Sequence, residues 1–358
     1  MKIVHVTEAF EGGVIEFLRS LTNATPDIEY TIIYGRHHFY DPVKAHFPSS
    51  VKFIPWPSVS REIKPKNDMK SLKELIAILK SEKPYDIIHL HSSKAGILGR
   101  AAAMLVGHKK VIYAPHGAAF LRKDVSALSR FAYINIERAG ALMPSRLVGV
   151  SESEAQAYKK IGVKSAHINN GKSFPEREED KKLFDGILKV VTTGRITQQK
   201  NAGWFNEIAK AFEGDDRVQF TWIGEGSERH LLTAKNISIT GWVSRAEVDK
   251  ILLQSDLYLS TALWEGLPYA LLEAMSIRLP LLLSNCPGNT DVGAHEKNGF
   301  IYNKPSDAVA YITQYMNDPS LLDKHGEEAY YMVKNDFSVY QMEQGYRKLY
   351  AEMIQRGK

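Results

Sequence analysis

Short apolar runs alternate with longer amphipathic segments through the first half of the chain. The predicted strands are residues 2–6, 30–34, 51–54, 87–90, 111–114 and 147–150, and the predicted helices are residues 13–21, 69–81, 95–105, 127–140 and 152–161. Short apolar strands separated by amphipathic helices form parallel sheets that are covered on both faces. Residues 1–170 are therefore predicted to form a doubly wound, Rossmann-like α/β domain.

The second half repeats this alternation after a break. Residues 171–187 combine turn residues with a mixed charge run at 176–182, and we interpret them as a linker. Strands are predicted at 188–194, 218–223, 237–240, 257–260 and 281–284, and the capping-box spacing of Ser244 and Glu247 predicts a helix start. The chain then becomes helical to its end. The last helix, at about 337–355, is a candidate to pack back on the first domain.

The fold class predicted is α/β, with two doubly wound domains at 1–170 and 188–358 and a helical C-terminal tail. Ligands of such domains bind at the carboxyl ends of the parallel strands. We therefore expect the two domains to face each other across a cleft that these ends line.

Composition narrows the class of protein. Hydrophobic residues make up 44% of the 358 residues, but no apolar run approaches the ~20 residues of a membrane span. Glu8 follows the short apolar start, so we expect a buried strand there rather than a secretory signal. The single cysteine, Cys286, excludes an internal disulfide and a cysteine-based metal cluster, and it fits a reducing compartment. We expect a cytoplasmic protein.

Charge is distributed unevenly over the two halves. Residues 1–165 carry 24 Lys and Arg against 15 Asp and Glu, whereas residues 166–358 carry 22 against 26. The basic first half suggests an anionic partner, either a membrane surface or a phosphate-bearing acceptor. Ordinary surface charge is the alternative.

The most informative motif is the segment from Glu265 to Glu273. Gly266, Leu267 and Pro268 form a turn that leads directly into a predicted helix at 269–277. Pro268 suits the first helical turn, and the backbone amides around it can bind an anion, which the helix dipole also favours. Anion-binding amides between two carboxylates suit a ligand with phosphate in the middle and hydroxyl groups at both ends.

Two cations and several glycines follow strands of the second half. Gly194 and Arg195 end the first of these strands, and Lys200 stands at a likely helix start, so the two cations can bind a diphosphate. Gly224 and Gly226 follow the next strand and allow a ligand to approach the backbone. Ordinary solvent-exposed loops are the alternative for both segments.

The first half offers weaker candidates at its own strand ends. Gly12 and Gly13 lie between the first strand and helix, but the Gly-x-Gly-x-x-Gly fingerprint is absent, which argues against an NAD site. Ser92, Ser93 and Lys94 open a helix and can bind an acceptor phosphate or sugar, although a simple helix cap is equally consistent.

Histidines also follow strands of the first half. His116 comes after the strand at 111–114, where it can donate a hydrogen bond to a sugar hydroxyl or a phosphate, or can be a plain turn residue. His89 and His91 flank Leu90, and we expect them on opposite faces of their strand, a poor spacing for a shared metal. No Asp-x-Asp pair follows a strand in a position to hold a metal under a diphosphate. We predict no metal requirement and no cofactor.

Together these motifs resemble the retaining glycosyltransferases of family 4, which have the two-domain GT-B architecture. The resemblance covers nearly the whole chain, and its most specific part is the Glu-x7-Glu element, Glu265 to Glu273. It implies that Arg195 and Lys200 bind the donor diphosphate and that Glu273 accepts the ribose hydroxyls. It also implies that Glu265 contacts the donor sugar and that His116 touches the sugar or its phosphate from the other domain.

The segment from His91 to Gly96 looks like members that build bacterial surface polysaccharides from lipid-linked intermediates. The resemblance therefore implies a nucleotide-sugar donor, UDP being favoured, and a polyprenyl-diphosphate-linked or glycan acceptor. Asn289, Thr290 and Asp291 stand where family members usually carry Pro-Glu after a glycine, which leaves sugar identity open. A nucleotide-sugar epimerase, a phosphorylase of the same architecture and a non-catalytic binding module are the alternatives; nucleic acid is not an expected partner.

Overall fold

The computed structural model describes residues 1–36, 45–60, 62–174 and 184–355. The charge run predicted at 176–182 within the linker lies outside these residues. The chain divides into two compact units: Met1–Leu121 with Val125–Gly171 and Val339–Lys358, and Arg122–Asp124 with Lys172–Ser338. The C-terminal helix thus belongs to the first unit.

The first unit is a parallel sheet of seven strands in the described residues, in the order β3-β2-β1-β4-β5-β6-β7. The strands are β1 (Lys2–Ala9), β2 (Glu29–Arg36), β3 (Lys52–Pro55), β4 (Ile87–His91), β5 (Val111–Ala114), β6 (Arg146–Gly149) and β7 (Ser165–His167). The helices are α1 (Gly13–Ala24), α3 (Pro65–Ser81), α4 (Ser93–Leu105), the 3₁₀ turn η1 (Ala119–Leu121), α5 (Ala127–Gly140), α6 (Glu152–Lys160) and α13 (Val339–Gln355).

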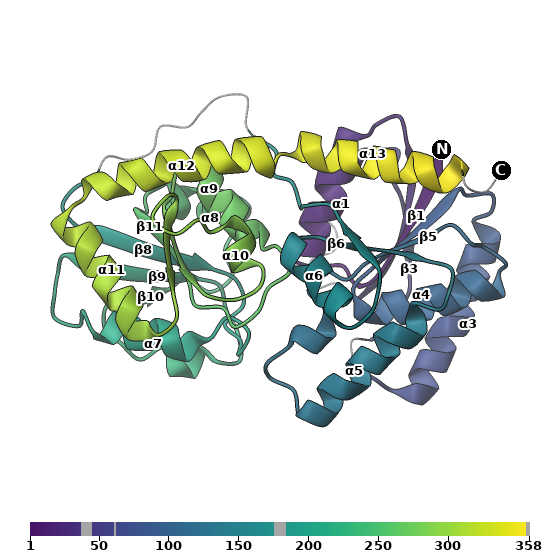
Figure 1. Ribbon diagram of the computed structural model, residues 1–358, viewed down its shortest axis with the longest axis horizontal. Coiled ribbons are helices and arrows are strands. Elements are labelled where there is room, and N and C mark those ends of the chain that lie inside the picture. The colour runs from purple at the N-terminus through teal and green to yellow at the C-terminus, as the bar shows by residue number, and fades with distance from the viewer. Residues whose placement is uncertain (37–44, 61, 175–183, 356–358) are drawn as a thin grey trace. The chain divides into compact units, whose positions relative to one another are not determined.

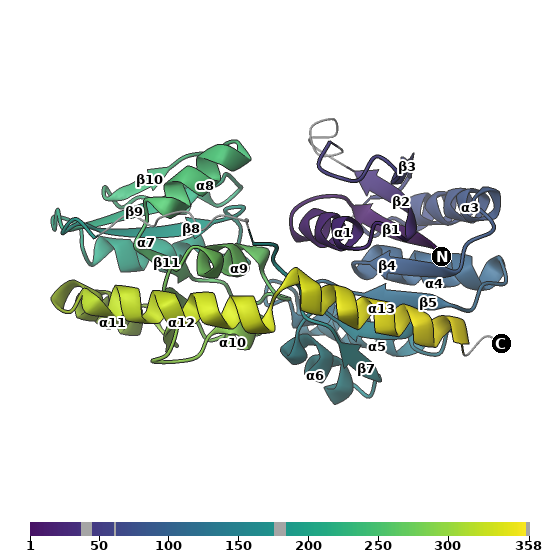
Figure 2. The ribbon, with the colours of Figure 1, turned by 90° about the horizontal axis from the view of Figure 1, so that it is seen from above.

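Helices cover both faces of this sheet. Figures 1 and 2 show α1 and α13 side by side over one face, where Phe17 packs edge-on against Tyr346. Figure 1 shows α3 and α4 on the opposite face, where Leu75 and Leu90 join one apolar core. Because both faces are buried there, central strands such as β5 are continuous apolar runs, which is the pattern that predicted them.

The second unit is a parallel sheet of six strands in the described residues, in the order β10-β9-β8-β11-β12-β13. The strands are β8 (Leu188–Thr193), β9 (Val218–Ile223), β10 (Ile237–Ile239), β11 (Leu257–Ser260), β12 (Leu281–Ser284) and β13 (Gly299–Tyr302). The helices are α7 (Ala202–Lys210), the 3₁₀ turn η2 (Arg229–Leu231), α8 (Arg245–Leu253), α9 (Tyr269–Ser276), α10 (Asn289–Val292), α11 (Pro305–Asn317) and α12 (Ser320–Asp336).

These two sheets confirm the prediction of two doubly wound α/β domains. The strand order reverses between β1 and β4 in the first unit and between β8 and β11 in the second. Loops on the two sides of such a reversal diverge, and ligands of doubly wound folds bind there. Within the described residues, no helix is both long and apolar enough to cross a membrane.

The structure differs from the expected elements mainly at edges and ends. Strand β7 was not predicted, because this three-residue edge strand has two exposed side chains and therefore no apolar run. Helix α3 begins at Pro65 rather than at residue 69, since a proline is accepted in the first helical turn. Helix α9 begins at Tyr269 with Pro268 as its N-cap, so the proline lies one position before the helix.

Candidate functional site

The loop after β8 lies against the loop after β9. A Cβ atom at Gly224 would lie 2.2 Å from the carbonyl oxygen of Gly194, and one at Gly226 would lie 2.2 Å from that of Ile196. Gly194 and Gly224 also have φ of 126° and 144°, which strongly favour glycine. These glycines therefore let two strand-end loops touch, which fixes the backbone on which Arg195 stands.

Lys200 and Glu265 form an ion pair in this region. The ammonium Nζ lies 2.8 Å from Glu265 Oε1, and the two side chains are 20% and 11% exposed. Gln199 Nε2 donates to Glu265 Oε2 at 3.2 Å. Burial lowers the pKa of Lys200, but the Glu265 carboxylate outweighs burial, so this pKa is raised and the ammonium stays charged. The structure thus brings together one cation and one carboxylate that are 65 positions apart.

The turn before α9 presents backbone as well as side chains. In the described part of the chain, no hydrogen bond engages the amide of Gly266. Arg195 is exposed on its loop. An unbonded amide beside a helix N-terminus attracts an anion, and anion binding at this turn stays a prediction.

Gly288 holds this turn in place. Its φ is 84°, and a Cβ atom there would lie 2.5 Å from Glu265 Cβ and 2.9 Å from the Gly266 carbonyl oxygen. The Glu265 amide donates to the carbonyl of Pro287 at 3.0 Å. Asp291 accepts from the Gly288 amide at 3.0 Å, so this carboxylate fixes the backbone at the start of α10.

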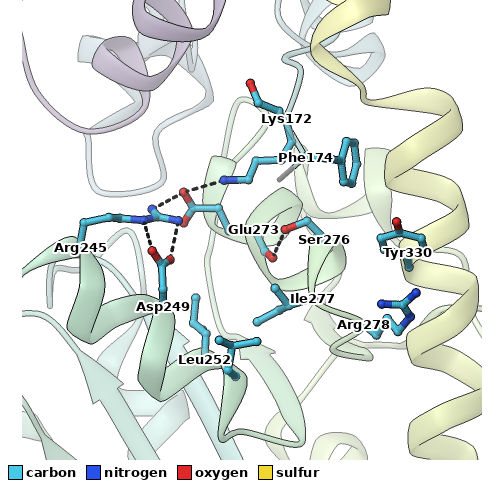
Figure 3. Close-up of a pocket in the computed structure, with 12 residues that line it drawn as sticks. Lys172, Phe174, Arg245, Asp249, Leu252, Glu273, Ser276, Ile277, Arg278 and Tyr330 are labelled. Atoms are coloured by element: carbon cyan, nitrogen blue, oxygen red, sulfur yellow. Dashed lines mark hydrogen bonds and ion pairs between the residues drawn. The ribbon is translucent and has the colours of Figure 1, made fainter. Parts of the chain in front are cut away.

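Glu273 lies in a separate ion-pair network. Its Oε1 accepts from Arg245 Nη1 and lies 3.8 Å from Lys172 Nζ. Figure 3 shows Arg245 between the carboxylates of Glu273 and Asp249, with Tyr330 across the pocket. The pocket measures about 230 Å³. This volume is below that of a drug-sized site and suits one part of a larger ligand.

In the first unit, His116 follows β5 in a left-handed conformation with φ of 54°. Such backbone strain in a non-glycine residue is concentrated at functional sites. The next amide, Gly117, donates to Glu154 Oε1 at 2.7 Å, and the other oxygen of Glu154 accepts from Val150 at 2.9 Å. Glu154 is fully buried and fixes the loop that carries His116.

The expectation that His89 and His91 lie on opposite faces is wrong. Residues two apart on a strand share a face, and their ring centroids are 4.3 Å apart. His5, which pairs with His89 across the sheet, joins them, and one ring nitrogen from each lies within 4.8 Å of the others. All three side chains are fully buried.

The acceptor candidates of the first unit have partners within that unit. Glu8 Oε2 accepts from the Ser92 hydroxyl and from the Ala95 amide, so a protein carboxylate caps the start of α4, where Ser93 lies. Lys94 Nζ lies 2.7 Å from Asp68 Oδ1. Ser92 itself makes no side-chain cap hydrogen bond, so the simple serine cap is not formed, and the carboxylate of Glu8 takes its place.

Gly12 is the exposed N-cap of α1 and Gly13 is its exposed first residue, and a Cβ atom at Gly12 would meet no atom within 4 Å. Steric crowding therefore does not require a glycine at this position. Only the φ of Gly12, 56°, favours one.

Comparison with known proteins decides the family. A model described as glycosyl transferases group 1 matches residues 173–332, and one described as a glycosyl transferase 4-like domain matches residues 34–170. The UDP-Gal:alpha-D-GlcNAc-diphosphoundecaprenol alpha-1,3-galactosyltransferase of Escherichia coli is 30% identical over 344 residues, which cover 87% of each chain. This chain is a group 1 glycosyltransferase.

Other relatives of this glycosyltransferase agree with that assignment. CapM, a capsular polysaccharide biosynthesis glycosyltransferase of Staphylococcus aureus, is 24% identical over 361 residues, covering 91% of this chain and 89% of CapM. The crystal structure of Anabaena Alr3699/HepE in complex with UDP and glucose has a TM-score of 0.78 at 14% identity, covering 98% of this chain and 100% of that chain. The likeness confirms the predicted GT-B fold.

Several site residues of the glycosyltransferase were not predicted. No functional role was predicted for Arg245, Gln199, Glu8 or Glu154. Each acts through a partner between 28 and 87 positions away, so no local pattern marks it. Gly288 alone carries a local signal, because a glycine between a strand and a short helix indicates a backbone constraint.

Proposed function

We propose that this glycosyltransferase moves a sugar, with retention of anomeric configuration, from a UDP-sugar to a lipid-linked or glycan acceptor in bacterial surface polysaccharide assembly. The observation that carries the proposal is the Lys200–Glu265 pair at 2.8 Å, in which Glu265 lies on the same turn as the unbonded Gly266 amide. A cation and an amide suit a diphosphate, and a carboxylate suits sugar hydroxyls. The name of the Escherichia coli relative supports UDP and a lipid-diphosphate acceptor.

The proposed reaction exchanges one C–O bond for another. The bond between the anomeric carbon and the diphosphate breaks, and the nucleoside diphosphate leaves with the electron pair. The acceptor hydroxyl attacks from the same face, and its proton passes to the departing phosphate oxygen. Negative charge grows on the diphosphate as the bond breaks, so Lys200 and Arg195 stabilise the transition state more than the ground state. Protein cations thus provide the neutralisation, without a metal ion.

The donor is proposed to bind the second unit and the acceptor the first. Glu273 accepts the ribose hydroxyls, and its bond to Arg245 fixes the carboxylate orientation. Gly194, Gly224 and Gly226 shape the backbone beside the diphosphate. In the first unit, His116 donates to the sugar or its phosphate.

Calorimetry with nucleoside diphosphates tests the donor site. UDP is expected to bind the intact protein more tightly than GDP or ADP, and Arg195→Ala and Lys200→Ala should each weaken binding about tenfold or more, since each removes a charge-assisted contact. Lys210→Ala, on the exposed end of α7, is the control and should bind UDP normally. Absence of UDP, GDP and ADP binding by the intact protein would refute the proposed donor class.

We also propose that the first unit associates with an anionic membrane surface. Helix α5 exposes Leu128 and Phe131, which are 77% and 63% exposed, on a helix that also carries Arg130 and Arg138 (Figure 1). Apolar and basic side chains on one surface helix are typical of interfacial binding. This helix adds apolar anchors to the uneven charge from which the sequence predicted a membrane surface.

Vesicle sedimentation tests this surface. Binding to phosphatidylglycerol vesicles is expected to exceed binding to phosphatidylcholine vesicles, and Phe131→Ser should weaken it roughly tenfold, as expected for partial burial of one aromatic ring. Tyr340→Ser is the matched control, because Tyr340 is 66% exposed on α13 of the same unit. Equal binding of both variants would place the membrane contact elsewhere.

A further inference from the structure

Three histidines of the first unit form a hydrogen-bonded chain that runs from the core of that unit to His116 at the end of β5. His5 Nδ1 lies 2.8 Å from His91 Nε2, and His91 Nδ1 lies 2.9 Å from His116 Nε2. His5 and His91 are fully buried, whereas His116 is partly exposed at the end of β5. Both ring nitrogens of His91 are therefore engaged, one on each side.

Every member of this chain is neutral at physiological pH. Burial lowers the pKa of His5 and of His116 to about 3, and it lowers the pKa of His91 well below its usual value. A neutral imidazole has one N–H and one lone pair. Because His91 has one of each, the two hydrogen bonds must point in the same direction, and only two arrangements exist.

The buried end of the chain distinguishes these arrangements. His5 Nε2 is buried and has no hydrogen-bond partner among the described residues. If the chain points inward, this atom carries a buried N–H without an acceptor; if it points outward, the atom is a bare lone pair. Unpaired buried N–H groups are the rarer and costlier case, so the outward arrangement is favoured.

We propose that the chain points outward and holds His116 in the tautomer whose Nδ1 carries the proton. His5 Nδ1–H donates to His91, His91 Nδ1–H donates to His116, and His116 then presents Nδ1–H as a donor. Among the described residues, no hydrogen bond engages that atom. If the proposed function holds, His116 uses this N–H to donate to a sugar hydroxyl or a phosphate oxygen, and this consequence rests on the proposed function. His91 is thus a positioning residue.

Nitrogen-15 NMR of the histidine rings in the full chain, without substrate, tests the proposal directly. His5, His91 and His116 are each expected to show the Nδ1–H tautomer, with signals assigned from single His→Gln variants. An Nε2–H tautomer at His116 would overturn the proposal. A metal signature would also overturn it: Zn²⁺ retained through dialysis, with metal-shifted nitrogens on His5, His89 and His91, would assign this cluster to an ion instead.

Two near-isosteric variants separate tautomer control from packing. In His91→Asn the side-chain amide N–H takes the place of Nδ1–H, so His116 should keep its tautomer and most of the turnover. In His91→Asp the carboxylate accepts from His116, so the tautomer should reverse and kcat should fall ~10–100-fold, the cost of losing an orienting partner. If the tautomer of His116 is reversed in one variant and kcat is nevertheless equal in both, the tautomer has no effect on catalysis.

Failure of the proposed function gives a different result. UDP binding should persist in both His91 variants, because Arg195, Lys200 and Glu273 of the second unit are proposed to hold the diphosphate and the ribose. Thermal unfolding reports whether the variants are folded. If the intact protein lacks transferase activity but shows three Nδ1–H tautomers, the tautomer assignment stands and the proposed function fails.

Discussion

Lys200→Met is expected to lower kcat by ~10²–10³-fold with UDP-sugar as donor. The side chain is the best-buried cation beside the Glu265 turn, with Nζ 2.8 Å from the carboxylate. In a site shielded from water, a cation stabilises the charge that develops on a leaving diphosphate more strongly than it stabilises the bound donor. Removal of one such donor group typically costs this factor. Steady-state kinetics with a lipid-diphosphate sugar acceptor measures the loss.

A second variant separates lost charge from lost structure. Lys200→Met leaves Glu265 without its cation. Breaking a fully buried ion pair lowers the free energy of unfolding by about 3–5 kcal/mol. A smaller loss is expected here, because both side chains are partly exposed. Lys200→Arg restores a cation, so this variant should recover the stability and part of the turnover. If Lys200→Met retains kcat within threefold of the intact enzyme, the leaving-group role of this lysine is wrong, whatever its effect on unfolding.

Gly288→Ala should lower turnover by ~10²-fold, although Gly288 carries no reactive group. The added Cβ would lie 2.5 Å from Glu265 Cβ and 2.9 Å from the carbonyl of Gly266, so the turn must move. Displacement of a catalytic group by about 1 Å is enough for this loss. Positive φ adds about 1–3 kcal/mol of strain and overpacking a similar amount. Urea unfolding and kcat are the two measurements.

Gly186→Ala is the matched control for this variant. Its φ is 93°, close to the 84° of Gly288, but a Cβ atom there would meet no atom within 4 Å. The control should therefore lose the strain energy alone and keep its turnover. Equal turnover of both variants would show that the Glu265 turn does not depend on contact with Gly288.

Much of the fold is predictable because it follows local patterns. Strands such as β5 and β12 are buried on both faces, so each is an unbroken apolar run. Ser244 does cap the helix that its spacing predicted, with its hydroxyl accepting from the Glu247 amide. Edge strand β7 lacks such a pattern, since it buries little, and it became visible only in the structure.

The site was predictable in kind but not in detail. Glu265, Lys200 and Gly194 are candidates because a turn, a helix start and strand ends are local features that favour anion binding. Their partners were not, since the contacts of Gln199, Arg245 and Gly288 are made between different strand-end loops. The expectation for His89 and His91 was wrong because residues two apart on a strand lie on the same face, a rule that needs no tertiary structure.

The sequence by itself determined two parallel-sheet domains and the residue types of the candidate site, because apolar periodicity and turn chemistry act over a few neighbouring residues. Only the tertiary structure decided which of those residues meet. It paired Lys200 with Glu265, placed Gly288 under the same turn, and linked His5 through His91 to His116. Parallel strands far apart in the chain end at one edge of a sheet, and contacts formed there depend on topology and register, which no local pattern encodes.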